Sequence, residues 1–468
     1  MEAHIHLAAM QACLGEPDIL TKPEDMAPYC IDQRRRYKGN AWAVLLPRSV
    51  AQVQTILRYC HTHNIPITPQ GGNTGLCGGA TPLASLNGKG FLLAMGRLNR
   101  VREVNTADNT ITVDAGMILA QVQQAARAAD RYFPLSLASE GTCQIGGNIA
   151  CNAGGLNVVR YGTARDLVLG LEYVLPNGTL VSHLQPLHKN TTGYELRQQI
   201  IGSEGTLAVI TGATLKLYAQ PQSVQTAWIG LNSIQAAVAL LGAVKNRFAE
   251  RLSSFELISD QALALSAQYS QHTPPVAAAW HVLLELTDSL PQAALDDPLI
   301  EVLSAGNWLN AVIAQSDTER QHLWLLRENI SAAQRHLGAS IKHDIAVPIA
   351  QVADFIETCA QAMDKLHPNT QLVIFGHLGD GSLHYNVFLP HVLNNAVYDF
   401  ETDINATVYE QVLAHHGTIA AEHGIGQLKT HWLTKVRSTE EIAWMRAQKD
   451  HFDPHHVLNP GKVIPATD

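Results

Sequence analysis

The chain has 468 residues, of which 46% are hydrophobic and 16% charged, and it carries a formal net charge of −9 at pH 7. This acidic balance, without a long lysine or arginine run, argues against nucleic acid or an anionic membrane as the main partner. No window approaches 18 uncharged apolar residues, and the acidic start lacks the basic region of a signal peptide. We therefore expect no transmembrane segment and a cytoplasmic protein of two or three domains.

The cysteine pattern agrees with a reducing compartment. The seven cysteines are scattered and include no CxxC pair. An odd number at irregular spacing predicts buried thiols rather than a disulfide framework or a thiolate zinc site.

The first half reads as alternating strands and helices from residue 42 onward, and a glycine-rich loop, QGGNTGLCGGATPL, occupies residues 70–83. A glycine-rich turn after a strand exposes successive backbone N–H groups, which bind phosphate without basic side chains. The spacing is not GxGxxG, and no Lys-Ser/Thr pair follows a GxxxxG, so this is neither a Rossmann fingerprint nor a P-loop. Taken alone, the loop is equally compatible with a tight connection.

Two further segments share this character. Residues 135–155 read LSLASEGTCQIGGNIACNAGG, in which small residues let the backbone approach a flat or extended ligand closely. A hairpin with Asn177-Gly178 as its turn follows, and then the segment IGSEGTLAVIT at residues 201–211.

Together the three segments, over about residues 42–217, resemble the flavin domain of the vanillyl-alcohol oxidase and p-cresol methylhydroxylase superfamily. The resemblance implies FAD, with the first loop cradling the pyrophosphate, the second segment running along the flavin, and the third contributing backbone contacts near the isoalloxazine. Some members link FAD through a histidine of the first loop; here that loop offers Asn73, so non-covalent FAD is expected. The implied FAD-binding residues are Gly71, Gly72, Asn73, Thr74, Gly75, Gly78, Gly79, Gly141, Thr142, Gly146, Gly147, Asn152, Gly154, Gly155, Glu204, Gly205 and, in the C-terminal tail, Asn459.

The composition shifts near residue 219, and the next 70 or so residues predict an antiparallel sheet with helices. Further on, a capping-box signature at Ser316 predicts a helix to about residue 336 that carries Arg327, with Ser331 on the same face. Lys342 lies in a predicted strand. A solitary arginine usually pairs with a surface carboxylate, and a strand lysine is often an ordinary edge residue. If they converge on one pocket, these side chains suit a small acid.

A predicted hairpin, QLVIFGHLGDGSLHYNVFL, spans residues 371–389 with its turn at residues 379–382. In the simplest register His377 opposes His384, with Cβ atoms about 4.5–5.5 Å apart. Two imidazoles held in this way can share a metal ion, although polar residues lining a loop would give the same letters. Asn386 points to the same face as His384.

The segment GTIAAEHGIGQLKTHWL, residues 417–433, places Glu422 and His423 beside two turn-forming glycines. Glu422 offers an oxygen that completes a His, His, Glu ligand set with one open position, which is typical of a catalytic metal site. His423 is then available as a base, since a histidine with an ordinary pKa of about 6.5 accepts protons at neutral pH.

The stretches GHLGDGSLH, KHDIAVP and AAEHGIG make the chain, from about residue 42 to 462, similar to the metal-dependent FAD-linked D-2-hydroxyacid dehydrogenases, which include D-2-hydroxyglutarate and D-lactate dehydrogenases and the glycolate oxidase flavin subunit. The resemblance implies His377, His384 and Glu422 as ligands of a divalent metal, with zinc ahead of manganese, and His423 as general base. It also implies substrate binding by Arg327, Ser331, Lys342 and Asn386. Ser331 stands where the hydroxyglutarate enzyme has threonine, and Glu140 where lysine is common, so the substrate stays open.

The expected fold class is α+β. It comprises a two-subdomain p-cresol methylhydroxylase-type FAD-binding domain (residues 1–219), a ferredoxin-like antiparallel substrate domain (220–420), and a C-terminal segment that returns to the FAD domain (421–468).

The expected reaction is oxidation of a D-2-hydroxy acid to the 2-oxoacid, with His423 as base and hydride transfer to flavin N5. A hydroxyglutarate-like dicarboxylate is favoured over D-lactate or glycolate. Without an NAD fingerprint, an electron-transfer flavoprotein, a quinone or a cytochrome is the expected acceptor, and a homodimer stays open. A metallohydrolase or a non-catalytic flavoprotein subunit would share parts of the pattern.

Overall fold

The computed structural model describes residues 2–306, 308–392 and 394–465, which form two compact units. The first unit comprises Met1–Ala153, Thr163–Ala219 and His423–Asp468, and the second comprises Gly154–Gly162 and Gln220–Glu422. The division into residues 1–219, 220–420 and 421–468 remains a prediction. Among the described residues, no helix combines the length and the apolar character needed to cross a membrane.

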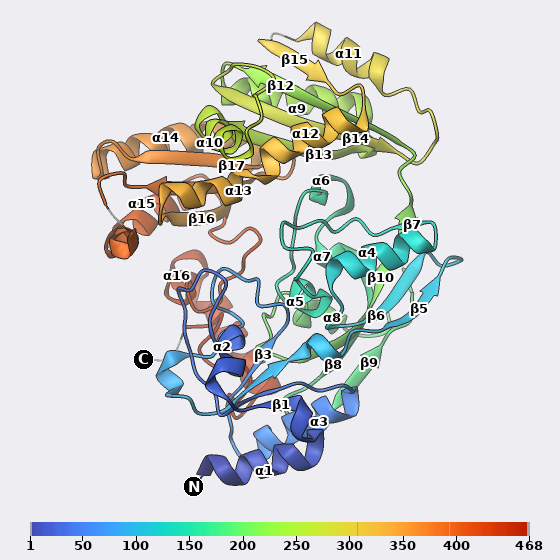
Figure 1. Ribbon diagram of the computed structural model, residues 1–468, viewed down its shortest axis with the longest axis vertical. Coiled ribbons are helices and arrows are strands. Elements are labelled where there is room, and N and C mark those ends of the chain that lie inside the picture. Colours follow the sequence, from blue (N-terminus) through green and yellow to red (C-terminus); the bar gives the residue numbers. More distant parts are fainter. Residues whose placement is uncertain (1, 307, 393, 466–468) are drawn as a thin grey trace. The chain divides into compact units, whose positions relative to one another are not determined.

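The first unit contains a four-stranded sheet in the order β1-β2-β4-β3, in which β4 runs parallel to both of its neighbours. Figure 1 labels the two edge strands, β1 and β3. Its strands are β1 (Ile19–Leu20), β2 (Ala43–Leu45), β4 (Phe91–Ala94) and β3 (Ile67–Gln70). Helices α1 (Glu2–Leu14) and α3 (Val50–Thr62) pack on one face, and α2 (Pro23–Cys30) packs on the other. Strands covered on both faces must be apolar throughout, which explains the runs AVL in β2 and FLLA in β4.

The second sheet of this unit is antiparallel, in the order β5-β6-β10-β8-β9. Its strands are β5 (Val101–Asn105), β6 (Thr110–Asp114), β10 (Val209–Lys216), β8 (Val168–Val174) and β9 (Leu180–His183). The unit is completed by α4 (Leu119–Ala128), α5 (Ile145–Ala150), α7 (Ala164–Leu167), α8 (Arg197–Ile200), α16 (Thr430–Val436), α17 (Thr439–Phe452) and the paired β7 (Arg131–Tyr132) and β11 (Tyr218–Ala219).

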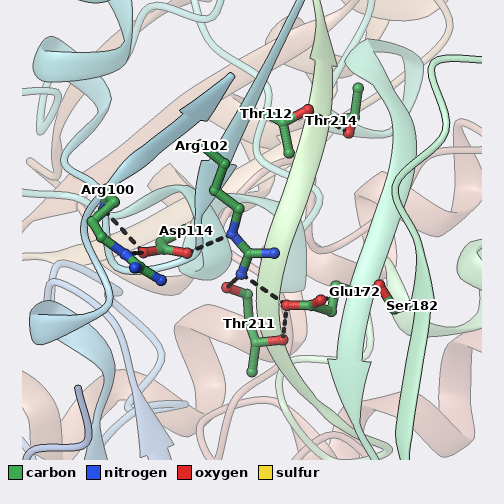
Figure 2. A network of polar contacts seen from close by, with 8 residues as sticks. All are labelled: Arg100, Arg102, Thr112, Asp114, Glu172, Ser182, Thr211 and Thr214. Carbon is green, nitrogen blue, oxygen red and sulfur yellow. Dashed lines mark hydrogen bonds and ion pairs between the residues drawn. The ribbon is translucent and has the colours of Figure 1, made fainter. Parts of the chain in front are cut away.

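A polar network links four strands of the second sheet (Figure 2). Arg102 on β5 donates through Nε to Asp114 on β6 (2.6 Å) and through Nη2 to Glu172 on β8 (2.8 Å). The same Nη2 also donates to the main-chain oxygen of Thr211 on β10 (3.2 Å). Both carboxylates are buried. Arg102 compensates both of them, and Arg100 adds a second cation at Asp114, with its Nε 3.0 Å from Oδ2.

The second unit is built on a seven-stranded antiparallel sheet in the order β15-β12-β14-β13-β17-β18-β16. All of these strands except β18 are labelled in Figure 1. Its strands are β15 (Asn310–Ile313), β12 (Ser223–Leu231), β14 (Trp280–Asp288), β13 (Leu252–Ser259), β17 (Gln371–His377), β18 (Ser382–Phe388) and β16 (Ile341–Ala346). Its helices are α6 (Val158–Tyr161), α9 (Ile234–Phe248), α10 (Asp260–Ser270), α11 (Asp296–Ala305), α12 (Asp317–Glu328), α13 (Ile330–Ala333), α14 (Val352–Leu366) and α15 (Glu401–Ala414). Helices packed on antiparallel sheets confirm the α+β class.

The predicted helix through Arg327 is interrupted at Asn329. Helix α12 ends at Glu328, and α13 begins at Ile330. The residue between them, Asn329, donates its backbone N–H to the carbonyl oxygens of Leu325 and Arg327. Asparagine favours such helix ends because its side chain competes for the backbone. Helical structure continues through α13 and a 3₁₀ helix at Gln334–Leu337, so the segment ends close to the predicted residue 336. After the interruption, Ser331 is exposed whereas Arg327 is buried.

The predicted hairpin is present as β17 and β18, but its register differs by two residues. Phe375, not His377, lies opposite His384, and residues 378–381 form the loop. The direct opposition of His377 and His384 is therefore wrong. Because side chains alternate with a period of two, an even slip keeps each residue on its face. The two imidazoles still lie close, with ring centroids 6.0 Å apart.

Candidate active site

Three side chains of the second unit bring metal-ligating atoms together. A ring nitrogen of His377, a ring nitrogen of His384 and a carboxylate oxygen of Glu422 all lie within 4.8 Å of one another. His377 ends β17, His384 lies in β18, and Glu422 follows in a loop. Two imidazoles and one carboxylate are donors that zinc takes, and three protein ligands leave a position for another oxygen. These residues fit a divalent metal.

Backbone contacts fix the orientation of Glu422. The N–H of Gly155 donates to Oε1 of Glu422 at 2.5 Å, and the N–H of Glu422 donates to Oδ2 of Asp344 at 3.0 Å. A Cβ atom on Gly154 would lie 2.7 Å from Oε1 of Glu422, so a glycine is needed there. The other oxygen of Glu422, Oε2, lies 3.8 Å from Nε2 of His377.

Glu256, a residue that the sequence reasoning missed, lies behind the metal-ligating cluster in β13. It is fully buried. Its Oε1 is 2.7 Å from Nδ1 of His377. Its Oε2 accepts a hydrogen bond from Nε of Arg327 (2.8 Å) and forms an ion pair with Nη2 of the same guanidinium (2.7 Å). The available signal was a single carboxylate within an otherwise uncharged strand, LSSFELIS, because a buried charge requires a partner.

The charges in this group shift one another's pKa. Burial raises the pKa of Glu256, but His377 and Arg327 outweigh burial and hold that pKa below its ordinary value. Burial lowers the pKa of His377, but the charge and hydrogen bond of Glu256 outweigh it and raise that pKa to about 9. Each group therefore favours the charged form of the other.

The structure brings three of the four predicted substrate-binding residues into this sheet region. Arg327 is buried, with its guanidinium carbon 4.8 Å from the centre of the Phe375 ring. Lys342 on β16 lies opposite Asn386 on β18. The fourth predicted residue, Ser331 in α13, is exposed.

The structure also gives the surroundings of Asn386, a predicted substrate-binding residue, and of His423, the predicted base. Asn386 is buried and donates through Nδ2 to Oε1 of Gln334 at 2.8 Å. His423, the predicted base, directly follows Glu422 in the chain and is half-buried. Its role remains a prediction.

In the first unit, the glycine-rich segments pack closely against one another. A Cβ atom on Gly72 of the first segment would lie 2.2 Å from the main-chain oxygen of Thr142 in the second. A Cβ atom on Gly146 would lie 2.8 Å from the Cβ of Ala115, which directly follows β6 and lies outside these segments. Such close backbone approach requires glycine. The chemistry of these segments, with exposed backbone donors and few charges, fits a dinucleotide pyrophosphate.

The C-terminal tail reaches both the first and the third glycine-rich segments. Asn459 donates through Nδ2 to the main-chain oxygens of Gly79 (3.0 Å) and Glu204 (2.8 Å). The buried Lys462 donates through Nζ to the main-chain oxygens of Gly78 (2.8 Å) and Thr81. The tail thus supports the loop predicted to bind FAD.

The remaining predicted FAD contacts divide between the units. Gly154 and Gly155 group with the second unit. Asn152 and Glu204 adopt positive φ of 52° and 50° in the first unit. The other predicted FAD residues of the same segments are Gly71, Asn73, Thr74, Gly75, Gly141, Gly147 and Gly205, and their contacts with FAD remain predictions.

Comparison with known proteins covers both halves of the chain. The profile of the family described as FAD linked oxidases, C-terminal domain, matches residues 220–463, and that of the FAD binding domain matches residues 41–183. A protein of Xanthomonas citri pv. viticola, named D-2-hydroxyglutarate dehydrogenase, is 36% identical over 466 residues, which cover 99% of this chain and 97% of that protein.

Two further similarities agree with these matches. A protein of the same name from Stutzerimonas stutzeri is 35% identical over 461 residues, covering 97% of each chain. Among solved structures, p-cresol methylhydroxylase with substrate bound has a TM-score of 0.79 at 17% identity, covering 99% of this chain and 97% of that chain. At that identity the structural similarity supports the fold alone.

Proposed function

Because this chain belongs to the FAD linked oxidases and is an FAD-dependent D-2-hydroxyacid dehydrogenase, we propose that a divalent metal, zinc ahead of manganese, assists its reaction. The observation that carries this proposal is the approach of donor atoms from His377, His384 and Glu422 to within 4.8 Å of one another. Membership of this family sets aside the metallohydrolase and the non-catalytic flavoprotein subunit.

The favoured substrate is a D-2-hydroxyglutarate-like dicarboxylate. A planar guanidinium binds a carboxylate through two parallel hydrogen bonds, and lysine adds a point charge. Glu256 takes the Nε and Nη2 edge of Arg327, so a substrate carboxylate would meet the opposite edge. Lys342, beside Asn386 on the neighbouring strand, supplies the second cation.

The protein groups orient the substrate and accept its proton. When bound, the metal supplies Lewis-acid polarisation that lowers the pKa of a coordinated hydroxyl. When bound, FAD supplies an acceptor for the hydride equivalent. His423 takes the hydroxyl proton, and Arg327 and Lys342 select which face of C2 is presented.

Anaerobic bleaching of the flavin tests the substrate and the metal together. The purified flavoprotein is mixed with D-2-hydroxyglutarate, D-lactate, glycolate and the L-enantiomers, and absorbance near 450 nm is followed before and after chelator treatment. We expect the fastest bleaching with D-2-hydroxyglutarate, loss after chelation and recovery with Zn²⁺. Bleaching unaffected by complete metal removal would refute the metal proposal, and faster bleaching by a monocarboxylate would refute the dicarboxylate preference.

The base is tested by His423→Asn. Loss of a general base costs about 10²–10⁴-fold in turnover, while the 450 nm absorbance of bound FAD should remain. His188→Asn, at an exposed position of the same unit, is the matched control. Near-normal turnover of the first variant would contradict the role of His423.

For reoxidation we propose an electron-transfer flavoprotein, a quinone or a cytochrome, because the sequence lacks an NAD fingerprint. Substrate-reduced enzyme can be mixed with one representative of each class and with NAD⁺. Reoxidation by NAD⁺ at a comparable rate would contradict this assignment.

A further inference from the structure

We propose that Glu256 is a positioning residue that holds the metal ligand His377 and the substrate-binding Arg327 in one fixed arrangement. This inference rests on the proposed metal site and extends it to a carboxylate that neither the sequence motifs nor the ligand set includes. Glu256 comes from β13, whereas His377 comes from the adjacent β17 and Arg327 from α12.

Each carboxylate oxygen of Glu256 has a separate task. Oε1 lies 2.7 Å from Nδ1 of His377, whereas Oε2 accepts a hydrogen bond from Nε of Arg327 and pairs ionically with its Nη2. The hydroxyl of Ser254 adds a longer donation to Oε1 at 3.4 Å. A fully buried carboxylate is strongly destabilised unless such partners surround it, so its location implies a structural or a functional demand.

The contact with His377 determines which ring nitrogen can bind a metal. A carboxylate oxygen accepts, so Nδ1 of His377 must donate, and Nε2 is then the atom available for coordination. That Nε2 lies 3.8 Å from Oε2 of Glu422, on the side of the other ligands. Histidine ligands that donate their second N–H to a carboxylate are fixed in tautomer and ring orientation.

The contact with Arg327 restrains the guanidinium in the same way. Two of its nitrogens converge on Oε2 of Glu256, and its Cζ lies over the Phe375 ring, 4.8 Å from the ring centroid. Phe375 is the direct strand partner of His384, with ring centroids 4.8 Å apart. One carboxylate and one phenyl ring therefore connect Arg327 to both histidine ligands.

Substitution of Glu256 tests this role through metal affinity, measured without turnover. In Glu256→Gln one oxygen remains, and the other is replaced by an N–H₂ donor. If that donor faces Arg327, two donors oppose each other. If it faces Nδ1 of His377, it favours the tautomer that carries its proton on Nε2, the atom needed for the metal. Glu256→Asp retains the charge and is too short to reach both partners. We expect the Kd for Zn²⁺ of the metal-depleted, FAD-loaded protein to rise about 10–100-fold in both variants.

The matched control is Glu285→Gln on the neighbouring strand β14. Glu285 also accepts side-chain hydrogen bonds, from Thr226 (3.0 Å) and from Nε1 of Trp324 (2.8 Å), but it does not belong to the metal-ligating groups. Its loss should lower thermal stability and leave the Kd for Zn²⁺ within about twofold, which separates a positioning role from a purely structural one.

Competition with a chromogenic chelator gives the Kd for Zn²⁺ in each protein. If wild type binds one Zn²⁺ tightly and both Glu256 variants bind equally well, the positioning role is overturned while the metal site stands. If wild type itself binds no Zn²⁺ above the level of a His377→Ala variant, the proposed metal site fails and this inference fails with it. Should Glu256→Gln not fold, the same comparison is made with Glu256→Asp.

Discussion

Replacing Arg102 with methionine should destabilise the first unit by about 3–5 kcal/mol at pH 7, the usual cost of removing one partner from a buried ion pair. Arg102 contacts two carboxylates at once, Asp114 and Glu172 (Figure 2). Their side chains are 0% and 9% exposed. Methionine retains the apolar part of the side chain, so the loss is mainly electrostatic.

The two carboxylates should respond unequally to this change. Asp114 also accepts from the backbone N–H (3.1 Å) and the Nε (3.0 Å) of Arg100, and would keep that cation. Glu172 would retain only the hydroxyls of Thr211 (2.9 Å) and Ser182 (3.0 Å) as donors among the contacts described. Most of the expected cost therefore falls on Glu172, a charge left in the interior without a cation.

The stability loss should depend on pH with a definite sign. Burial raises the pKa of Glu172, but Arg102 outweighs burial and holds that pKa below its ordinary value. A carboxyl group with a depressed folded-state pKa contributes stability above its unfolded pKa of about 4 and loses it as pH falls through the folded value. Without Arg102, burial prevails and Glu172 is protonated more readily. The difference between variant and wild type should therefore be largest at pH 7 and shrink toward pH 4.

Denaturant unfolding of the FAD-loaded proteins between pH 4.5 and 8 measures this difference. The control is Arg437→Met, which removes an exposed pair with Glu441 and should change the free energy of unfolding far less than the loss of a buried pair, because solvent screens exposed charges. Two results would refute this account of the network. One is a loss of unfolding free energy below about 1 kcal/mol at pH 7 for Arg102→Met, which is far less than the cost expected for a buried pair. The other is a loss that does not decrease on acidification.

Two further predictions concern the site and the cofactor loop. Gly154→Ala would place a Cβ 2.7 Å from Oε1 of Glu422 and should weaken Zn²⁺ binding about tenfold; Gly242→Ala, where a Cβ meets nothing within 4 Å, is the control, and equal Kd values for Zn²⁺ would contradict the prediction. Lys462→Met removes the ammonium that donates to two carbonyls of the first glycine-rich loop and should raise the Kd for FAD about tenfold, since leaving a buried acceptor unpaired costs about 1–3 kcal/mol; unchanged FAD retention on dilution would show that this contact does not shape the loop.

Local patterns were sufficient to identify the β17–β18 hairpin and the shared face of its two histidines. The turn letters and the alternation of side chains act over a few residues, so they are visible in one sequence. The register was not predictable to the residue, because a slip of two leaves the facial pattern unchanged. The loop that forms uses Gly381 at a φ of 85°, with Oδ1 of Asp380 accepting from the N–H of Ser382.

Contacts between distant residues depended on the tertiary structure. The sheet order places β13 beside β17, which brings Glu256 against His377 across 121 residues. Gly155 reaches Glu422 across 267 residues, and Asp344 does so across 78. The spacing of hydrophobic and polar residues along the sequence does not indicate contacts between residues so far apart.

The amino-acid sequence by itself determined the α+β class, the glycine-rich segments and the residue types able to hold a metal, because each of these depends on neighbours in the chain. Only the tertiary structure decided how those residues are oriented. Examples are the buried carboxylate of Glu256, which contacts His377 and Arg327, and the N–H of Gly155, which donates to Glu422. Strand order and loop closure set those contacts through long-range packing, and packing depends on the whole core rather than on any local stretch.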